Sequence, residues 1–192
     1  MKYFALLLVL SLSFHIVSAQ NDPASTKFIR AIFHDKDIVY TDSLGGANLK
    51  EIKKAIDSSS ESNYFFLGKN KKNHEKLSFT REEKLYINKQ LSTLQFFTWQ
   101  PGLLTDAKFV RIDTIRKIFA DSGQFSGWQY IYKHYGRQIC SFSKPIFLRH
   151  TTVCIFYSDY DCGSLCGGGG LSVYIKRNGI WQRAFMLYVW MS

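Results

Sequence analysis

The chain has 192 residues, of which 46% are hydrophobic, 16% aromatic and 21% charged, and its formal net charge is +10. This composition supplies enough apolar surface for a packed core and excludes a disordered tail protein, a collagen or coiled coil, and a membrane protein with several spans. The sequence therefore predicts a globular domain, but it contains no motif that identifies an activity.

Residues 1–19 have the pattern of a secretory signal peptide. Lys2 supplies the positive charge, residues 4–12 are mostly apolar, and small residues at 17–19 form a cleavage site. The apolar run is too short for a membrane span of about 20 residues. We therefore expect cleavage near Ala19 and a mature protein, residues 20–192, that is secreted or periplasmic and has no transmembrane span.

Residues 20–136 favour helices and residues 137–192 favour strands, which predicts a single α+β domain. Asn48 and Glu51 resemble a helix-capping pair, and Thr80 and Glu83 form a better capping box. Each opens an expected amphipathic helix, and residues 64–67 between them are an apolar run suited to a strand. The expected inward-facing residues of these helices are Leu49, Ile52, Ile56, Ile87, Leu91 and Leu94.

The densest basic segment lies between these two helices, at residues 68–76. Its lysines are Lys69, Lys71, Lys72 and Lys76. A solvated loop is the simplest interpretation, although such a segment also attracts anionic envelope polymers. No aromatic side chain lies among the lysines, which argues against nucleic-acid binding.

Pro101-Gly102 predicts a turn, and residues 108–112 are suited to a strand. Ser126 is the expected cap of a third helix, which ends at Gly136. Its apolar stripe consists of Trp128, Ile131, Tyr132 and Tyr135, residues that more often belong to a core than to a ligand site.

The C-terminal third predicts a four-stranded antiparallel meander sheet on which the N-terminal helices pack. We expect the strands near residues 138–148, 152–159, 171–177 and 180–190. Asn178-Gly179 is the strongest turn signal, because a two-residue type I′ turn needs positive φ at both positions. This turn places Trp181 opposite Lys176. The last strand is almost entirely apolar and is expected to be covered on both faces.

Cys162 and Cys166 lie four residues apart, before a run of glycines. In an exported chain the two sulfurs are expected to form a disulfide in a turn between the second and third strands. The motif and the upstream histidines do not fit a papain-like nucleophile, and the cysteine spacing is poor for zinc, so we expect no metal and no cofactor. The candidate binding loop consists of Gly167, Gly168, Gly169 and Gly170 with Asp159 and Asp161, and an anion cradled by the glycine N–H groups is the alternative.

The sequence does not determine whether Cys140 and Cys154 form a second disulfide. A simple hairpin about residues 149–151 would place Cys154 nearer Ile146 than Cys140. A second disulfide then forms only if the register differs or a bulge intervenes.

Five segments of the C-terminal third resemble a family of small, mostly uncharacterised exported proteins of Bacteroidota-type bacteria. They are Phe142-Ser-Lys-Pro-Ile-Phe147, Cys154-Ile-Phe-Tyr157, Cys162-Gly-Ser-Leu-Cys166-Gly167, Asn178-Gly-Ile-Trp181 and Trp190-Met-Ser192. The resemblance implies an exported domain with a small C-terminal sheet, and it implies no activity, cofactor or catalytic residue. The longer glycine run and the pair Cys140 and Cys154 depart from the family pattern.

These observations favour a non-enzymatic exported module that binds an envelope protein or another envelope component. The first alternative is an envelope hydrolase whose site combines Asp159, Asp161 or His150 beside the cysteine segment. The second is a protein that binds polyanions through residues 68–76.

Overall fold

The computed structural model describes residues 22–33, 38–44, 49–58, 65–66, 78–94 and 97–192. Within these ranges the chain is an α+β protein, as the sequence predicts. The helices are α1 (Pro23–Ile32), α2 (Leu49–Asp57), α3 (Arg81–Thr93) and α4 (Ile112–His134). The strands are β1 (Val39–Thr41), β2 (Phe65–Phe66), β3 (Lys108–Val110), β4 (Ile139–Phe142), β5 (Ile146–Leu148), β6 (Val153–Gly163), β7 (Cys166–Arg177) and β8 (Ile180–Met191). The expected signal peptide and the lysine segment 68–76 lie outside the described residues.

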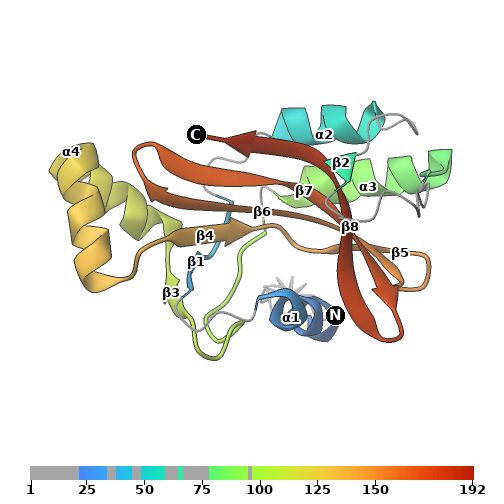
Figure 1. The fold of residues 1–192 in the computed structure, drawn as a ribbon, viewed down its shortest axis with the longest axis horizontal. Coiled ribbons are helices and arrows are strands. Elements are labelled where there is room, and N and C mark those ends of the chain that lie inside the picture. Colours follow the sequence, from blue (N-terminus) through green and yellow to red (C-terminus); the bar gives the residue numbers. More distant parts are fainter. Residues whose placement is uncertain (1–21, 34–37, 45–48, 59–64, 67–77, 95–96) are drawn as a thin grey trace, which may run out of the picture.

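The described strands form one mixed sheet in the order β2-β8-β7-β6-β4-β1-β3, and β5 pairs with β6 off this path (Figure 1). The antiparallel meander β6-β7-β8 is present, but β1 runs parallel to both β3 and β4. The predicted four-stranded antiparallel sheet was therefore too small and partly wrong in strand direction. Strands β1 and β3 have three residues each, so they show no alternation in the sequence.

The first predicted strand, 138–148, is divided into β4 and β5. Residues 143–145 stand opposite only two residues of β6, Phe156 and Tyr157, which makes a bulge. Pro145 has no N–H for the ladder. Ser143 compensates, because its N–H donates to Tyr157 O at 2.9 Å and its hydroxyl accepts from Tyr157 N at 3.1 Å.

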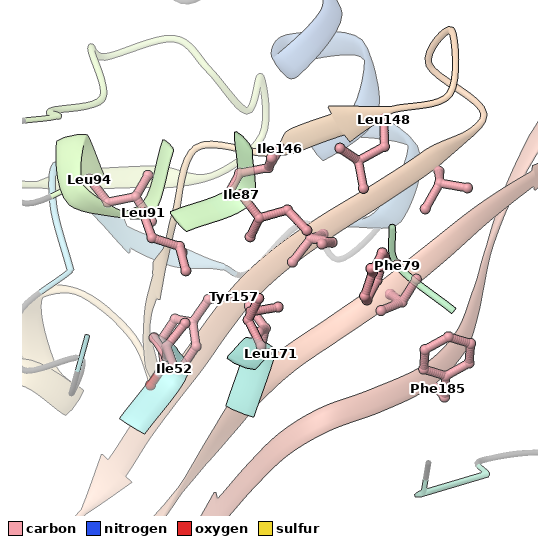
Figure 2. Packing of buried hydrophobic residues seen from close by; sticks show 14 residues of the cluster. Ile52, Phe79, Ile87, Leu91, Leu94, Ile146, Leu148, Tyr157, Leu171 and Phe185 are labelled. Carbon is pink, nitrogen blue, oxygen red and sulfur yellow. The ribbon is translucent and has the colours of Figure 1, made fainter. Parts of the chain in front are cut away.

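Helices α2 and α3 cover one face of the sheet and α1 covers the other (Figure 1). Alternate residues of β6 divide between the two faces: Ile155 and Tyr157 pack with α2 and α3, whereas Cys154 and Phe156 pack in the cluster of α1. Figure 2 shows the first of these cores. The predicted inward residues Ile52, Ile56, Ile87, Leu91 and Leu94 are all buried there, and the side chain of Leu49 lies outside the described part.

The core under α1 is aromatic. The ring of Phe28 stands edge-on to four others at centroid distances of 5.8, 5.2, 5.2 and 5.1 Å, and these rings belong to Phe147, Phe156, Tyr174 and Trp181. Edge-to-face pairs of this kind each stabilise by about 0.5–1.5 kcal/mol beyond area burial. Strand β8 is nevertheless less covered than predicted, since Phe185 is its one buried residue and its described outer neighbour is the two-residue β2.

The capping box of α3 is confirmed: Thr80 Oγ1 accepts from Glu83 N at 3.2 Å, and Glu83 Oε2 accepts from Thr80 N at 3.0 Å. Helix α2 begins at Leu49 and ends at Asp57, as predicted, while the proposed cap Asn48 lies outside the described residues. The run 64–67 gives β2 at residues 65–66.

The third helix was predicted too short. Helix α4 begins at Ile112, and Ser126 lies inside it rather than at its start. Gly123, with φ 69 and ψ 175, breaks it into two parts. Gly127 lets the parts come together, because a Cβ at this glycine would lie 2.5 Å from the ring of Phe119. The strand predicted at residues 108–112 is present as β3 at 108–110, and no element was predicted for residues 113–125.

Helix α4 covers the end of the sheet next to β4. Its residues Ile115, Trp128 and Ile131 form a third core with Val39 and Ile139. Since Ile139 pairs with Asp161 of β6, this end of the sheet also carries the acidic residues of β6. In the described part of the chain, none of the helices is both long enough and apolar enough to cross a bilayer.

The predicted hairpin at Asn178-Gly179 is confirmed. Asn178 and Gly179 have φ values of 49 and 80, and Arg177 pairs with Ile180. Lys176 is opposite Trp181, as expected, and its Nζ lies 5.6 Å from the ring centroid.

Gly179→Val should destabilise the protein by at least about 1 kcal/mol, because a β-branched residue is strained at positive φ. Nothing lies within 4 Å of the position that the Cβ would take, so the cost is conformational rather than steric. Thermal melts of the variant and of Gly179→Asn, which tolerates this conformation better, provide the measurement. Equal losses in both variants would contradict the assignment to backbone strain.

Candidate functional site

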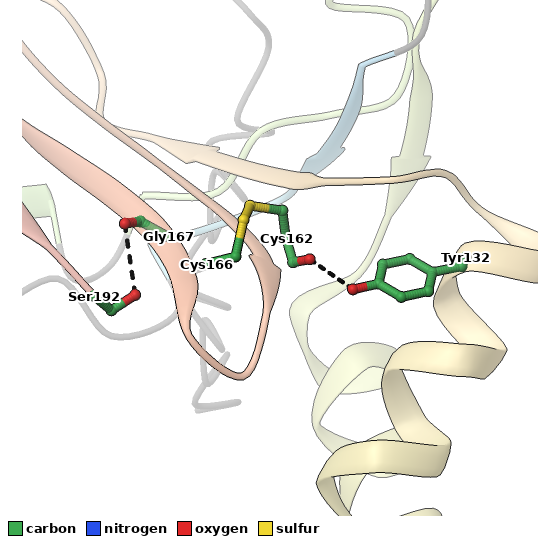
Figure 3. Close-up of a disulfide and its surroundings, with 5 residues drawn as sticks. All are labelled: Tyr132, Cys162, Cys166, Gly167 and Ser192. Carbon is green, nitrogen blue, oxygen red and sulfur yellow. Dashed lines mark hydrogen bonds between the residues drawn. A yellow bond between two sulfur atoms is a disulfide. The ribbon is translucent and has the colours of Figure 1, made fainter.

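The predicted disulfide between Cys162 and Cys166 is present, with a Cα–Cα distance of 5.0 Å (Figure 3). It closes the tip of the β6–β7 hairpin, where Gly163 pairs with Cys166. The carbonyl of Cys162 also accepts a hydrogen bond from the Tyr132 hydroxyl at 2.6 Å. The disulfide and this contact hold the hairpin tip beside α4.

The candidate binding loop is not a loop. Gly167, Gly168, Gly169 and Gly170 lie within β7 and pair with residues 158–161 of β6. Glycine is rare in strands, so the sequence indicated a turn here. Pairing with strands on both sides overrides this preference, because residues 168–170 pair with β8 as well as with β6.

Peptide mapping without reduction should recover Cys162 and Cys166 in one linked fragment. Reducing this bridge should lower the free energy of unfolding by roughly 2 kcal/mol or less, because the closed ring is short. The double variant Cys162→Ser/Cys166→Ser measures the same loss without a reductant. Alkylation at either position in the unreduced native protein would contradict the pairing.

Cys140 and Cys154 do not form the second disulfide that the sequence left open. Cys140 pairs with Tyr160, whereas Cys154 pairs with Phe147, next to Ile146 as the simple hairpin predicted. Six residues of β6 separate the two positions, roughly 20 Å at the usual rise, which is beyond the reach of a disulfide. Both thiols are buried, and desolvation raises the pKa of Cys154 well above its ordinary value.

A cavity of about 490 Å³ lies between α4 and the face of the sheet that carries α2 and α3. We call it the aspartate pocket. Its lining residues are Ile112, Ile115, Arg116, Phe119, Trp128, Ile139, Ser141, Tyr157, Asp159, Asp161, Tyr188 and Trp190. Asp159 and Asp161 point to the same side because they are two residues apart on one strand.

The glycines of β7 make room for the two carboxyl groups. Asp159 pairs with Gly169 and Asp161 pairs with Gly167. A Cβ at Gly169 would lie 2.5 Å from the Asp159 Cβ, and a Cβ at Gly167 would lie 2.8 Å from the Asp161 Oδ1. The glycine run is therefore a spatial requirement of the acidic pair rather than a flexible loop.

Asp159 is partly buried, and desolvation raises its pKa to about 6. The charge of Asp161 adds to this rise, while hydrogen bonds from Tyr157 and Ser141 oppose it. The Ser141 hydroxyl is in turn 3.0 Å from Thr41 Oγ1. Hydroxyl groups from two strands thus hold the carboxylate in place.

Tyr157 connects the carboxylate to β8. Trp190 donates its Nε1–H to the Tyr157 hydroxyl at 2.9 Å, and Tyr157 bonds to Asp159. Desolvation, followed by the charge of Asp159, raises the pKa of Tyr157, so the hydroxyl keeps its proton at neutral pH. The direction of donation runs from Trp190 through Tyr157 to the carboxylate.

Asp161 stands at the more exposed mouth of the pocket, where desolvation also raises the pKa of its carboxyl. The cationic residue of the described lining is Arg116, whose Nη1 lies 3.1 Å from Asp113 Oδ1 outside the pocket. The pocket lining therefore carries more negative than positive charge.

His150 does not join the aspartates, which corrects the grouping expected for a hydrolase. It lies in the exposed turn before β6, where Arg149, His150 and Thr151 have φ values of 51, 53 and 62. Asp159 is six residues beyond the start of β6, roughly 20 Å along the strand. The Arg149 guanidinium holds this turn to α3 through Glu83, at 2.7 and 2.9 Å.

A second cavity, of about 330 Å³, lies on the opposite face of the sheet. Its lining residues include Gly168, Gly169 and Gly170 of β7, and also Cys140, Asp159, Arg183 and Met186. The glycine run therefore borders this second cavity, and through Gly167 and Gly169 it also leaves room for the carboxyl groups of the aspartate pocket.

Sequence reasoning found Asp159 and Asp161 but missed their partners, chiefly Tyr157, Ser141, Tyr188 and Trp190. The alternation of Tyr157, Asp159 and Asp161 was a usable signal once β6 was known to extend to Gly163. No pattern in the sequence predicted that residues of α4 would line the pocket.

Within the described residues, no group of three or more His, Cys, Asp or Glu side chains is arranged to hold a metal ion. In comparisons with known proteins, no family model, curated protein or solved structure matches the chain. The geometry of the aspartate pocket is therefore the basis for assigning a function.

Proposed function

We propose that this protein is a non-enzymatic binding module exported to the cell envelope, and that the aspartate pocket holds its ligand. The observation that carries the proposal is the partly buried carboxylate of Asp159 beside a second carboxylate. Desolvating a carboxylate costs stability, so its presence in a cavity favours a functional role over a structural one. Pockets of this size are common for small molecules.

The chemistry of the lining favours binding over catalysis. The described lining contains no histidine, cysteine or lysine that could serve as a base or nucleophile, and His150 is remote. The fixed hydroxyl groups of Ser141 and Tyr157 are instead suited to orienting a carboxylate that receives a ligand.

Export is part of the same proposal. The signal-peptide pattern of residues 1–19 and the disulfide at Cys162 and Cys166 support an oxidising compartment. The resemblance to exported Bacteroidota-type proteins also supports it, and the partner is then an envelope component.

Thermal melts of the mature chain against a panel of small envelope constituents test the proposal. A ligand should raise the melting temperature of the wild type and fail to do so with Asp161→Asn. Asp121→Asn is the matched control, since Asp121 is exposed on α4 and does not line the pocket. A ligand that stabilises all three proteins equally would place binding elsewhere.

A hydrolase is the second candidate, because one observation favours it. A carboxyl with a pKa of about 6 beside a second carboxyl is the arrangement that general acid catalysis uses near neutral pH. Release of reducing ends from envelope polysaccharide, lost in Asp159→Asn, would favour this alternative. Binding of the polysaccharide without its hydrolysis would favour the binding module.

A further inference from the structure

We propose that the aspartate pocket binds an organic cation, a small molecule with a primary or quaternary ammonium group between the carboxylates and the aromatic wall. The inference rests on the proposed function and specifies the ligand class of the same site. It combines three features of the described pocket: its charge, its aromatic lining and the absence of a metal-binding set.

The charge of the pocket favours a cation. Asp159 and Asp161 both line the cavity and lie on the same strand. The nearby charge that affects the pKa of Asp159 is the negative charge of Asp161. Arg116 also lines the cavity and pairs with Asp113, so in the described lining two carboxylates stand against one guanidinium. A bound ammonium group would relieve the repulsion between the two carboxylates, whereas an anion would increase it.

The aromatic lining favours an ammonium group over a hydrated inorganic ion. Trp128, Tyr157, Tyr188 and Trp190 contribute to the wall. Ring faces attract cations that have lost their water, and carboxylates combined with aromatic rings are the usual means of recognising ammonium groups. The hydrogen bond from Trp190 to Tyr157 fixes two of these rings before a ligand arrives.

The donor set is poor for calcium or magnesium. Calcium takes six to eight oxygen ligands, and magnesium needs near-octahedral oxygen coordination. The described pocket offers two carboxylates, and the Tyr157 hydroxyl is already engaged with Trp190 and Asp159. A neutral sugar could donate hydroxyl hydrogens to the carboxylates, but it would leave both charges uncompensated.

Calorimetric titration with choline, cadaverine, 3,3-dimethyl-1-butanol and calcium chloride tests the ligand class. The butanol has the shape of choline without its charge, so it isolates the electrostatic part of binding. We expect choline or cadaverine to bind, and the butanol and calcium to bind at least about tenfold more weakly. Equal affinity for choline and the butanol would overturn the proposal.

Variants separate this inference from the proposed function. Asp159→Asn and Asp161→Asn should each weaken cation binding about tenfold or more, and Asp121→Asn should not. Circular dichroism confirms that each variant is folded. If a neutral envelope saccharide binds in an Asp161-dependent manner while both cations fail, the binding module stands and the cation class is wrong. If choline, cadaverine and the saccharides all bind the Asn variants like the wild type, or bind none of the proteins, both proposals fail.

Discussion

Asp159→Asn should stabilise the protein at pH 8 and leave its stability nearly unchanged at pH 4. The folded carboxyl has a pKa of about 6 and keeps its proton up to about that pH, whereas the unfolded one loses its proton near the ordinary pKa of 3.8. Between these values the folded state binds more protons, so the free energy of unfolding falls as pH rises. The wild type therefore loses stability across this window, and the neutral Asn does not.

The shift corresponds to roughly 3 kcal/mol as an upper bound, and partial exposure of Asp159 reduces the expected gain at pH 8 to about 1–2 kcal/mol. The other carboxyl group that lines the pocket is that of Asp161, and desolvation raises its pKa as well. Urea unfolding at pH 4, 6 and 8 measures the difference.

Asp161→Asn is the control, and it should show a smaller gain because Asp161 is more exposed. A gain for Asp159→Asn that is equal at pH 4 and pH 8 would show that the carboxylate charge is not its cause. A stabilising substitution that also removes binding would identify Asp159 as a residue that lowers stability for the sake of function.

Gly170→Ala should destabilise the protein by roughly 3 kcal/mol, since it forces two strands apart. A Cβ at Gly170 would lie within van der Waals overlap of the Tyr188 carbonyl oxygen and 2.6 Å from the Met186 methyl group. The methyl group can move, but the carbonyl belongs to the backbone of β8. The β7–β8 ladder is already irregular here, because its register shifts between Leu171 and Ser172.

Gly168→Ala is the matched control from the same run of glycines. Its Cβ would meet its nearest neighbours, Trp190 O and Tyr160 Oη, at the ordinary contact distance of 3.4 Å, and its φ is not positive. Alanine there should be neutral or stabilise by a few tenths of a kcal/mol, because it restricts the unfolded chain. Thermal melts compare the two variants, and equal melting temperatures would contradict the described spacing of β7 and β8.

Features whose causes lie within a few neighbouring residues were predictable from the amino-acid sequence alone. The capping box of Thr80 and Glu83, the turn at Asn178-Gly179 and the disulfide of Cys162 and Cys166 were all predicted correctly. Each depends on local hydrogen bonds, local φ values or a short ring, which a chain specifies without reference to distant segments.

The remaining features were not predictable, because they depend on contacts between segments that are distant in the sequence. Residues 167–170 became a strand because β6 and β8 flank them, against their own preference. Strand β1 joined β3 and β4 in parallel, which no local pattern signals. The same sheet extended β6 past Asp159 and Asp161, separated them from His150, and set them under α4 with Trp190. The acidic residues were visible in the sequence, but the pocket that gives them a role exists only after the strands pair.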